Sequence, residues 1–199
     1  MKIYLRPLLS LIIVSIAALL GGCVTHITTD VTQNPPPLEK FASFTHFEMA
    51  KVALVSPYAG QETNQRALIK IQENVTLRMD PLLATWNTTG ATVTPVRTLV
   101  ITPVVTEIKF ISGGARFWAG AFAGSSAVVL TAKIIDKDTG KVISSPTFYA
   151  HASAMGGAWT IGSTDNLMLA RVAGRLTTYL EANYTAPVGG PSGADPATK

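Results

Sequence analysis

Residues 127–153 constrain the fold of this chain more than any other stretch. The run from Ala127 to Asp136 alternates two partly apolar faces, as a β-strand does, and a second β-rich run extends from Lys141 to Ser153. The turn between them, Asp136-Lys137-Asp138-Thr139-Gly140, starts with Asp and ends with a glycine suited to a left-handed backbone. The sequence therefore predicts an antiparallel hairpin, and Pro146 marks an edge or a bulge in its return strand.

Two more strands are predicted ahead of this hairpin. A β-rich run at about 48–55 is bounded by Pro57 and Gly60, and a long β-branched run extends from Arg97 to Phe110. Pro103 lies in the middle of the second run and lacks an N–H. We therefore expect that strand to be an edge strand or to carry a bulge.

Two helices complete the predicted elements. From Gln61 to Trp86 apolar residues recur at spacings of three and four, and Asp80-Pro81 predicts a kink or a second helix there, with a polar loop at 87–94. The last helix is capped by Ser163 or Thr164, and Arg171 and Arg175 are expected on its solvated side. The apolar faces consist of Leu68, Ile71, Val75, Met79, Leu82 and Trp86 in the first helix, and Met168, Leu169, Val172, Leu176, Tyr179 and Leu180 in the last.

These elements predict an α/β fold of the α+β type. Its order is strand, helix, strand, strand, strand, helix, and we expect a small, mainly antiparallel four-stranded sheet with two main helices packed on one face. The predicted domain spans residues 41–184 of the 199-residue chain, long enough to bury a core.

The N-terminus has the three parts of a secretory signal. Lys2 and Arg6 form a basic start, and an apolar run of 13 residues extends from Leu8 to Leu20. This run is shorter than the ~20 residues that span a bilayer, so it predicts a removable signal rather than a permanent anchor. The signal peptide is assigned to residues 1–22.

Leu20-Gly21-Gly22-Cys23 resembles the lipobox of bacterial lipoproteins. The resemblance implies cleavage between Gly22 and Cys23 and a covalent lipid, such as palmitate, on Cys23; no other cofactor is expected. It also accounts for a lone cysteine in an exported chain. Val24 stands where an Asp would favour retention in the inner membrane, which implies the periplasmic face of the bacterial outer membrane. The alternative is an ordinary signal peptide beside a chance cysteine.

The two segments that flank the domain are polar and aperiodic. Residues 23–40 are predicted to be a flexible, proline-rich linker, in which Thr25 to Leu38 would reach ~50 Å when fully extended. Residues 185–199 are predicted to be a disordered tail by composition.

The stretch from Ile111 to Ser126 combines four glycines with Phe117, Trp118 and Phe122. Its spacing matches neither a phosphate-binding loop nor a dinucleotide fingerprint. Three interpretations stay open: a loop whose aromatic side chains cover the core, a loop for self-association or a protein partner, and a segment in shallow contact with a membrane. Phe117, Trp118 and Phe122 are the candidate interaction residues.

Charge and motifs exclude several classes of function. Once the signal is removed, 14 basic residues face 12 acidic ones without clustering, so nucleic-acid binding is not expected. The three histidines are dispersed, and no hydrolase or zinc-protease motif occurs. We therefore predict no catalytic residues, no metal ligands and no enzymatic activity.

Gly114 to Ser126 (GARFWAGAFAGSS), the following strand and the turn DKDTG together carry a resemblance. Over about residues 97–153 the chain resembles a family of bacterial envelope lipoproteins that is defined as a domain of unknown function, of the 4410 type. The resemblance implies an envelope location and an α/β fold. It supplies no substrate, cofactor or active site.

The leading hypothesis is a non-enzymatic, membrane-anchored envelope lipoprotein that binds a partner or contributes to envelope assembly. The partner would be another protein or a second copy of the chain, in addition to the membrane itself. The alternative is a periplasmic carrier or transport-auxiliary lipoprotein that holds a lipid or other apolar ligand in a cavity between sheet and helices.

Overall fold

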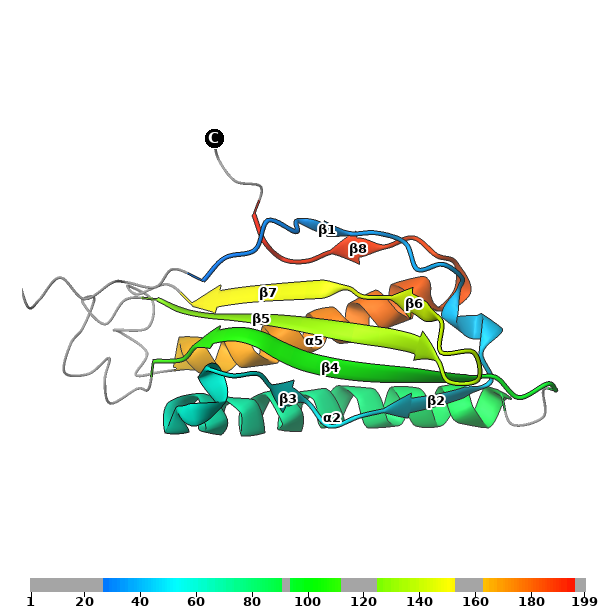
Figure 1. Cartoon of the computed structure of the whole chain (residues 1–199), viewed down its shortest axis with the longest axis horizontal. Coiled ribbons are helices and arrows are strands. Elements are labelled where there is room, and N and C mark those ends of the chain that lie inside the picture. The colour runs from blue at the N-terminus through cyan, green and yellow to red at the C-terminus, as the bar shows by residue number, and fades with distance from the viewer. Residues whose placement is uncertain (1–26, 91–93, 112–124, 153–162, 196–199) are drawn as a thin grey trace, which may run out of the picture.

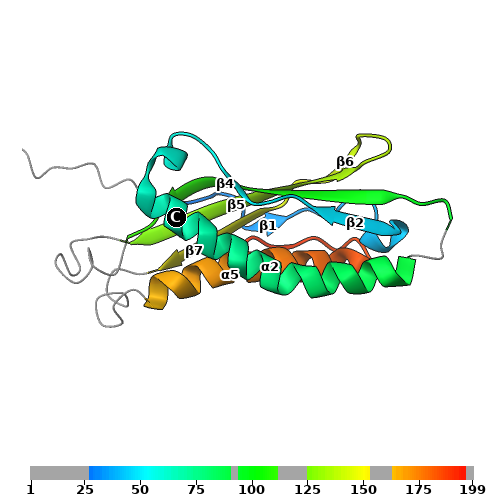
Figure 2. The ribbon, with the colours of Figure 1, turned by 90° about the horizontal axis from the view of Figure 1, so that it is seen from below.

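The computed structural model describes residues 27–90, 94–111, 125–152 and 163–195. Within these ranges two long helices lie on one face of a mixed sheet (Figures 1 and 2), which is an α+β architecture. The helices are α2 (Glu62–Gly90) and α5 (Ser163–Thr185), and the main strands are β4 (Thr98–Lys109), β5 (Ser126–Asp136) and β7 (Thr147–Ala152). Shorter elements are β1 (Gln33–Asn34), η1 (Phe41–Ser43), β2 (His46–Met49), β3 (Ala53–Leu54), η2 (Tyr58–Gly60), β6 (Val142–Ser144) and β8 (Gly190–Pro191).

The main sheet has six strands rather than the predicted four. β2 and β3 follow one another along one side of β4, both parallel to it, and β6 and β7 follow one another along the far side of β5, both antiparallel to it. β4 and β5 pair antiparallel at the centre. The sheet is thus four strands wide, and each of its two outer rows is broken in two.

The two breaks occur beside prolines, for different reasons. Pro146 lies in the outer row between β6 and β7, as an edge proline should. Pro103 is in the central strand β4, so the expectation of an edge there is wrong. Its partner on β5, Ala132, donates its N–H away from β4, to Pro146 O. The backbone nitrogen of Pro103 therefore faces away from β5, toward the outer row formed by β2 and β3, and no β5 carbonyl is left without a donor there. The first row is interrupted at that position, between Met49 and Ala53.

The bulge predicted for this strand lies three residues further along. The register between β4 and β5 shifts between Val105 and Glu107. Because one extra residue reverses the alternation of side chains, Val105 and Ile108 both face the helices and are both buried. The bulge therefore keeps the apolar face continuous along a twelve-residue strand.

Helix α2 continues through Pro81 to Gly90, so neither a second helix nor a loop begins where we expected it. Proline in a helix interior costs about 3 kcal/mol because it removes one hydrogen bond and crowds the preceding turn. The apolar face offsets this cost, since Met79, Leu83 and Trp86 are buried on both sides of the proline. The predicted apolar face of α5 is confirmed in full: all six of its residues are buried.

The chain termini form a second, two-stranded sheet, in which β1 pairs antiparallel with β8. We call residues 27–34 and 189–195 the terminal ribbon. It covers the outer edge of β7 (Figure 1): the side-chain amide of Asn34 accepts from Thr147 N at 2.7 Å and donates to Thr147 O at 2.9 Å, and Tyr149 N donates to Ser192 O. One side-chain amide thus takes the place of a neighbouring strand.

The terminal ribbon corrects two predictions. Residues 27–40 of the expected linker and 186–195 of the expected tail are held by specific contacts in the structure. The Asn183 carboxamide is buried and satisfied at both ends, accepting from Val188 N and Gly189 N and donating to Tyr179 O and Gly189 O. It folds the chain back after α5. The signal peptide lies outside the described residues.

Candidate functional site

Ile27 begins the described chain and is fixed to the sheet. It lies on the face away from the helices, in a small cluster with Ala127, Val129 and Tyr149, and only 3% of it is exposed. The Tyr149 hydroxyl donates to Ile27 O at 3.2 Å in a buried hydrogen bond. Burial raises the pKa of Tyr149, so this donor stays protonated at neutral pH.

This attachment shortens the distance over which Cys23 could hold the domain. Ile27 is four positions after Cys23, and such a segment spans ~14 Å at most. The ~50 Å expected of a free spacer is therefore wrong for a chain that is already bound to the sheet at Ile27. Only one end of the domain lies within that reach of Cys23. An anchor on Cys23 would therefore orient the domain with this end toward the anchor.

We call this the tether end of the domain. β4 ends there at Lys109, β5 starts there at Ser126, and Ile111 N donates to Ser126 Oγ at 3.0 Å. Helix α5 also starts at this end, since Arg171 donates to His151 O near the end of β7. Figure 1 shows Ile27's segment (blue) beginning beside the end of β7.

The predicted site residues fall outside the described residues: Gly22 and Cys23 precede them, and Phe117, Trp118 and Phe122 lie between Ile111 and Ser126. The structure nevertheless fixes the two residues that flank the glycine–aromatic stretch. Both are at the tether end, joined by the hydrogen bond just described. Ile27 lies at the same end, because it clusters with Ala127, the residue after Ser126.

A hollow of about 350 Å³ opens to solvent at the tether end. Its lining is apolar at Ile69 and Phe110 and polar at Arg66, Lys70 and Asn166. Ile69 is 59% exposed, so the hollow presents an apolar side chain to solvent. Arg66 and Lys70 form surface ion pairs with Glu62 and Glu73, so the hollow carries little net charge.

The opposite end, which we call the far end, holds a cluster of charged side chains. Arg97 forms a bidentate salt bridge with the Glu39 carboxylate, with N–O distances of 2.9 and 3.1 Å. Its Nη2 also donates to Asp136 Oδ2 at 2.8 Å, and its Cζ lies 4.2 Å from the centre of the Phe44 ring. Asp136, whose side chain is 3% exposed, also accepts from the N–H groups of Asp138 and Thr139 in the hairpin turn. Gly140 closes that turn with φ of 70°.

This cluster fixes the protonation of its carboxyl groups. Hydrogen bonding and charge from Arg97 hold the pKa of Glu39 and of Asp136 below the usual carboxyl range, and the two backbone donors lower that of Asp136 further. Every charge is matched by a fixed partner. The cluster therefore joins the segment before β2 to the sheet and the hairpin turn, and it presents no free acid or base for chemistry.

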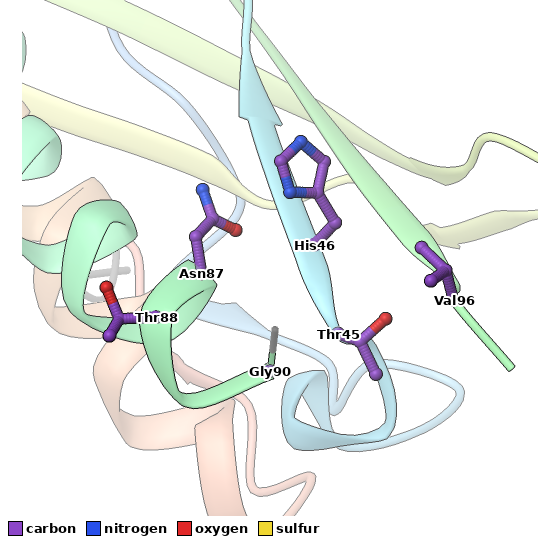
Figure 3. A pocket seen from close by; sticks show the side chains of 6 residues that line it. All are labelled: Thr45, His46, Asn87, Thr88, Gly90 and Val96. Atoms are coloured by element: carbon purple, nitrogen blue, oxygen red, sulfur yellow. The ribbon is translucent and has the colours of Figure 1, made fainter. Parts of the chain in front are cut away.

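A second hollow, of about 500 Å³, lies at the far end where α2 ends (Figure 3). His46 lines it, with its Nε2 3.9 Å from Glu48 Oε1, too far for a hydrogen bond. Asn87 lines it too, but its amide is committed to the backbone: it accepts from Phe47 N at 2.7 Å and donates to Phe47 O at 3.1 Å. Thr45 Oγ1 likewise accepts a hydrogen bond from the backbone N–H of Arg97, the residue before β4. The remaining lining residues, Thr88, Gly90 and Val96, add no titratable group.

Across residues 27–90, 94–111, 125–152 and 163–195, no three His, Cys, Asp or Glu side chains are grouped as metal ligands. His151 is exposed and stacks on Tyr149 with ring centres 5.7 Å apart. In the same ranges, no helix combines the length and the hydropathy that crossing a membrane requires.

No protein-family model and no curated protein matches this sequence. Solved structures give distant likenesses. PelC from Paraburkholderia phytofirmans, a dodecamer, is 16% identical with a TM-score of 0.37, over 70% of this chain and 91% of PelC. A candidate lipoprotein from Caulobacter crescentus CB15 is 12% identical with a TM-score of 0.32, over 68% of this chain and 91% of its own.

A third likeness is to protein XCC0632 from Xanthomonas campestris, of the family of unknown function 330. It is 14% identical with a TM-score of 0.39, over 79% of this chain and 94% of that one. Likenesses of this size show neither a shared family nor a shared activity.

Proposed function

We propose that this chain is a membrane-anchored bacterial envelope lipoprotein, acylated at Cys23, that holds its tether end toward the bilayer and binds a partner there. The observation that supports the proposal is the burial of Ile27 against the sheet, four residues after Cys23. A lipid on Cys23 would place the tether end within ~14 Å of the membrane surface. The location that goes with it is the periplasmic face of the outer membrane.

Partner binding is proposed for Phe117, Trp118 and Phe122. The flanking residues Ile111 and Ser126 lie at the tether end, so the stretch leaves and re-enters the domain beside the proposed anchor. Aromatic side chains among glycines are typical of interaction surfaces. The partner is another envelope protein or a second copy of this chain, and the proposed activity is non-enzymatic.

The packing of the sheet–helix interface favours this function over the carrier alternative. Large side chains from both helices and from the sheet fill that interface, among them Phe148, Met79 and Met168, each with no exposed surface. The two end hollows, and a third of about 370 Å³ between α2 and residues 51–52, are open to solvent rather than enclosed by the core. A carrier needs an apolar cavity of several hundred Å³ in that space.

Membrane orientation can be tested with single-cysteine labels, because acylation removes the Cys23 thiol from labelling chemistry. We expect a fluorophore at Leu167→Cys, near the tether end and 56% exposed, to be quenched by head-group quenchers in vesicles. The matched label at Val142→Cys, at the far end and 43% exposed, should stay bright. Equal quenching at both positions would contradict the orientation.

Two further variants test the anchor and the partner. Cys23→Ala should remove the protein from the membrane fraction; unchanged acylation and fractionation would contradict the lipoprotein proposal. Crosslinking in cells, with identification of the products by mass, should give a defined partner or oligomer. Changing Phe117, Trp118 and Phe122 together to Ser should abolish that product, and an unchanged product would contradict their role.

A further inference from the structure

A shallow groove of about 420 Å³ crosses the solvent-facing side of α5. Ala170 and Gly174 form its floor, because small residues leave the helix surface low. Arginines form its sides: Arg78 comes from α2, and Arg171 and Arg175 lie one turn apart on α5. Leu167, at the end of the groove nearest the tether end, is 56% exposed.

Unlike Arg66 and Arg97, these three arginines form no ion pair with a carboxylate among the described residues. Arg78 donates only to the backbone O and the side-chain Oδ1 of Asn74, and Arg171 donates to His151 O. No salt bridge in the described part of the chain includes any of the three. Arg66, also on α2, pairs with Glu62 instead.

Arg175 is the most constrained of them. Its Nη1 is buried and has no hydrogen-bond partner among the described residues. Gly193 of the terminal ribbon, at φ of 90°, lies so close over the guanidinium that a side chain at 193 would collide with it. Burial and the charge of Arg171 lower the pKa of Arg175, and Asp195 opposes this effect. A half-buried cation beside a second cation is unfavourable, and Asp195 offsets this only in part, since it forms no salt bridge with Arg175 in the described part of the chain.

We propose that this arginine groove binds the phosphate of an anionic phospholipid head group. Guanidinium groups match phosphate oxygens in geometry as well as charge, and neutral small residues between them leave room for the phosphate to approach. The choice of a lipid rests on the proposed function. Arg171 lies about 12 Å along α5 from its first residue at the tether end, which is the end that Cys23 would hold within ~14 Å of the bilayer.

The test uses the acylated protein in non-ionic detergent, so that it does not depend on how the domain is oriented on a membrane. Short-chain dihexanoyl phosphatidylglycerol is titrated while the arginine Nε–Hε signals are followed by NMR. We expect the signals of Arg171 and Arg175 to shift, and the exposed Arg66 to serve as internal reference. Dihexanoyl phosphatidylcholine has the same phosphate but no net charge, and should bind with an affinity lower by a factor of about ten or more.

Variants define the site further. Arg171→Gln with Arg175→Gln should weaken phosphatidylglycerol binding about tenfold or more, and Arg66→Gln should leave it unchanged. Gly174→Val fills the floor without removing a charge, and should weaken binding even if the double variant folds poorly. Gly174 tolerates a side chain, since a Cβ there would be 3.7 Å from Arg78 Nε.

Three results would overturn the proposal. Equal binding of the two lipids would show that the groove does not select an anion, and unchanged binding in Gly174→Val and in the double arginine variant would place the lipid elsewhere. Inorganic phosphate that binds as tightly as phosphatidylglycerol would assign the groove to free phosphate. None of these results bears on the quenching experiment, so the groove and the membrane orientation can fail independently.

Discussion

The two ends of this domain are stabilised by different forces. At the far end Arg97 donates hydrogen bonds to both Glu39 and Asp136, and the hairpin turn donates two backbone N–H groups to Asp136. At the tether end Ile27 is fixed by apolar contact with Val129 and Tyr149 and by a single neutral hydrogen bond. The two ends of the long axis are therefore fixed in different ways: the far end by matched charges around Arg97, and the tether end by apolar packing with one neutral hydrogen bond.

The largest expected effect comes from Arg97→Met, which removes the shared cation of the far end. It leaves Asp136 buried without its charged partner, so we expect the free energy of unfolding to fall by about 2 kcal/mol. This is less than the 3–5 kcal/mol of a fully buried pair because a third of the Arg97 side chain is exposed. Urea unfolding followed by circular dichroism measures the effect. Arg66→Met, which breaks an exposed pair, is the control and should cost little.

Acid should weaken the same end. The pKa values of Glu39 and Asp136 are lowered in the folded protein, so both groups contribute stability above the ordinary carboxyl value of about 4. That contribution is lost as pH falls through their lowered values. We expect stability to fall below about pH 4 in the parent protein, and to fall less in Arg97→Met. Parallel pH dependences of the two proteins would show that Arg97 does not lower these pKa values.

Tyr149→Phe probes the tether end without disturbing its apolar contacts. The variant loses only the hydroxyl that donates to Ile27 O, so the expected cost is about 1 kcal/mol. Unlike the effect at the far end, it should be the same in low and high salt, because no charge is involved. A strong salt dependence of this difference would show that the two ends are not distinct in the way described.

The smallest effect is expected for Glu48→Gln. Lys137 pairs with Glu48 at 2.7 Å, but their side chains are 54% and 40% exposed. Exposed pairs contribute 0.2–1 kcal/mol, so we expect a loss of about 0.5 kcal/mol or less that disappears in 1 M salt. A loss as large as that of Arg97→Met would mean that the far end is stabilised as one network and not by its buried cluster.

The parts of the fold that sequence could predict are those set by local pattern. The hairpin at Asp136 to Gly140 and the buried face of α5 were both predicted correctly because alternation, helical spacing and turn residues all lie within a few positions of each other. Pro81 misled the prediction because its local penalty is visible in sequence, whereas the burial of Trp86 that offsets it is a tertiary contact.

The contacts that define the two ends left little signal in the sequence. Arg97 and Glu39 are separated by 58 positions, and Tyr149 and Ile27 by 122. Two-residue strands such as β1 and β8 have no measurable periodicity. One weak signal existed: Asn34 and Asn183 stand beside proline- and glycine-rich segments, where an amide can replace missing backbone partners. Linker and tail compositions therefore predicted disorder where side-chain amides impose order.

The pairing of β1 with β8 also has a consequence for timing. If the chain is exported as proposed, its N-terminal part crosses the membrane first, and Gly190 and Pro191 would arrive after nearly all of the domain has been delivered. In the lipoprotein proposed above, Cys23 would stand on a free segment reaching ~60 Å from Phe41 while the modifying enzymes act on it. Once the chain is complete, the terminal ribbon would form, and the free segment between Cys23 and the folded domain would shorten about fourfold, from ~60 to ~14 Å. Cys23 would thus be accessible to the modifying enzymes early, and the orientation of the domain would be fixed last. The order of these two events would follow from the order of the residues in the chain.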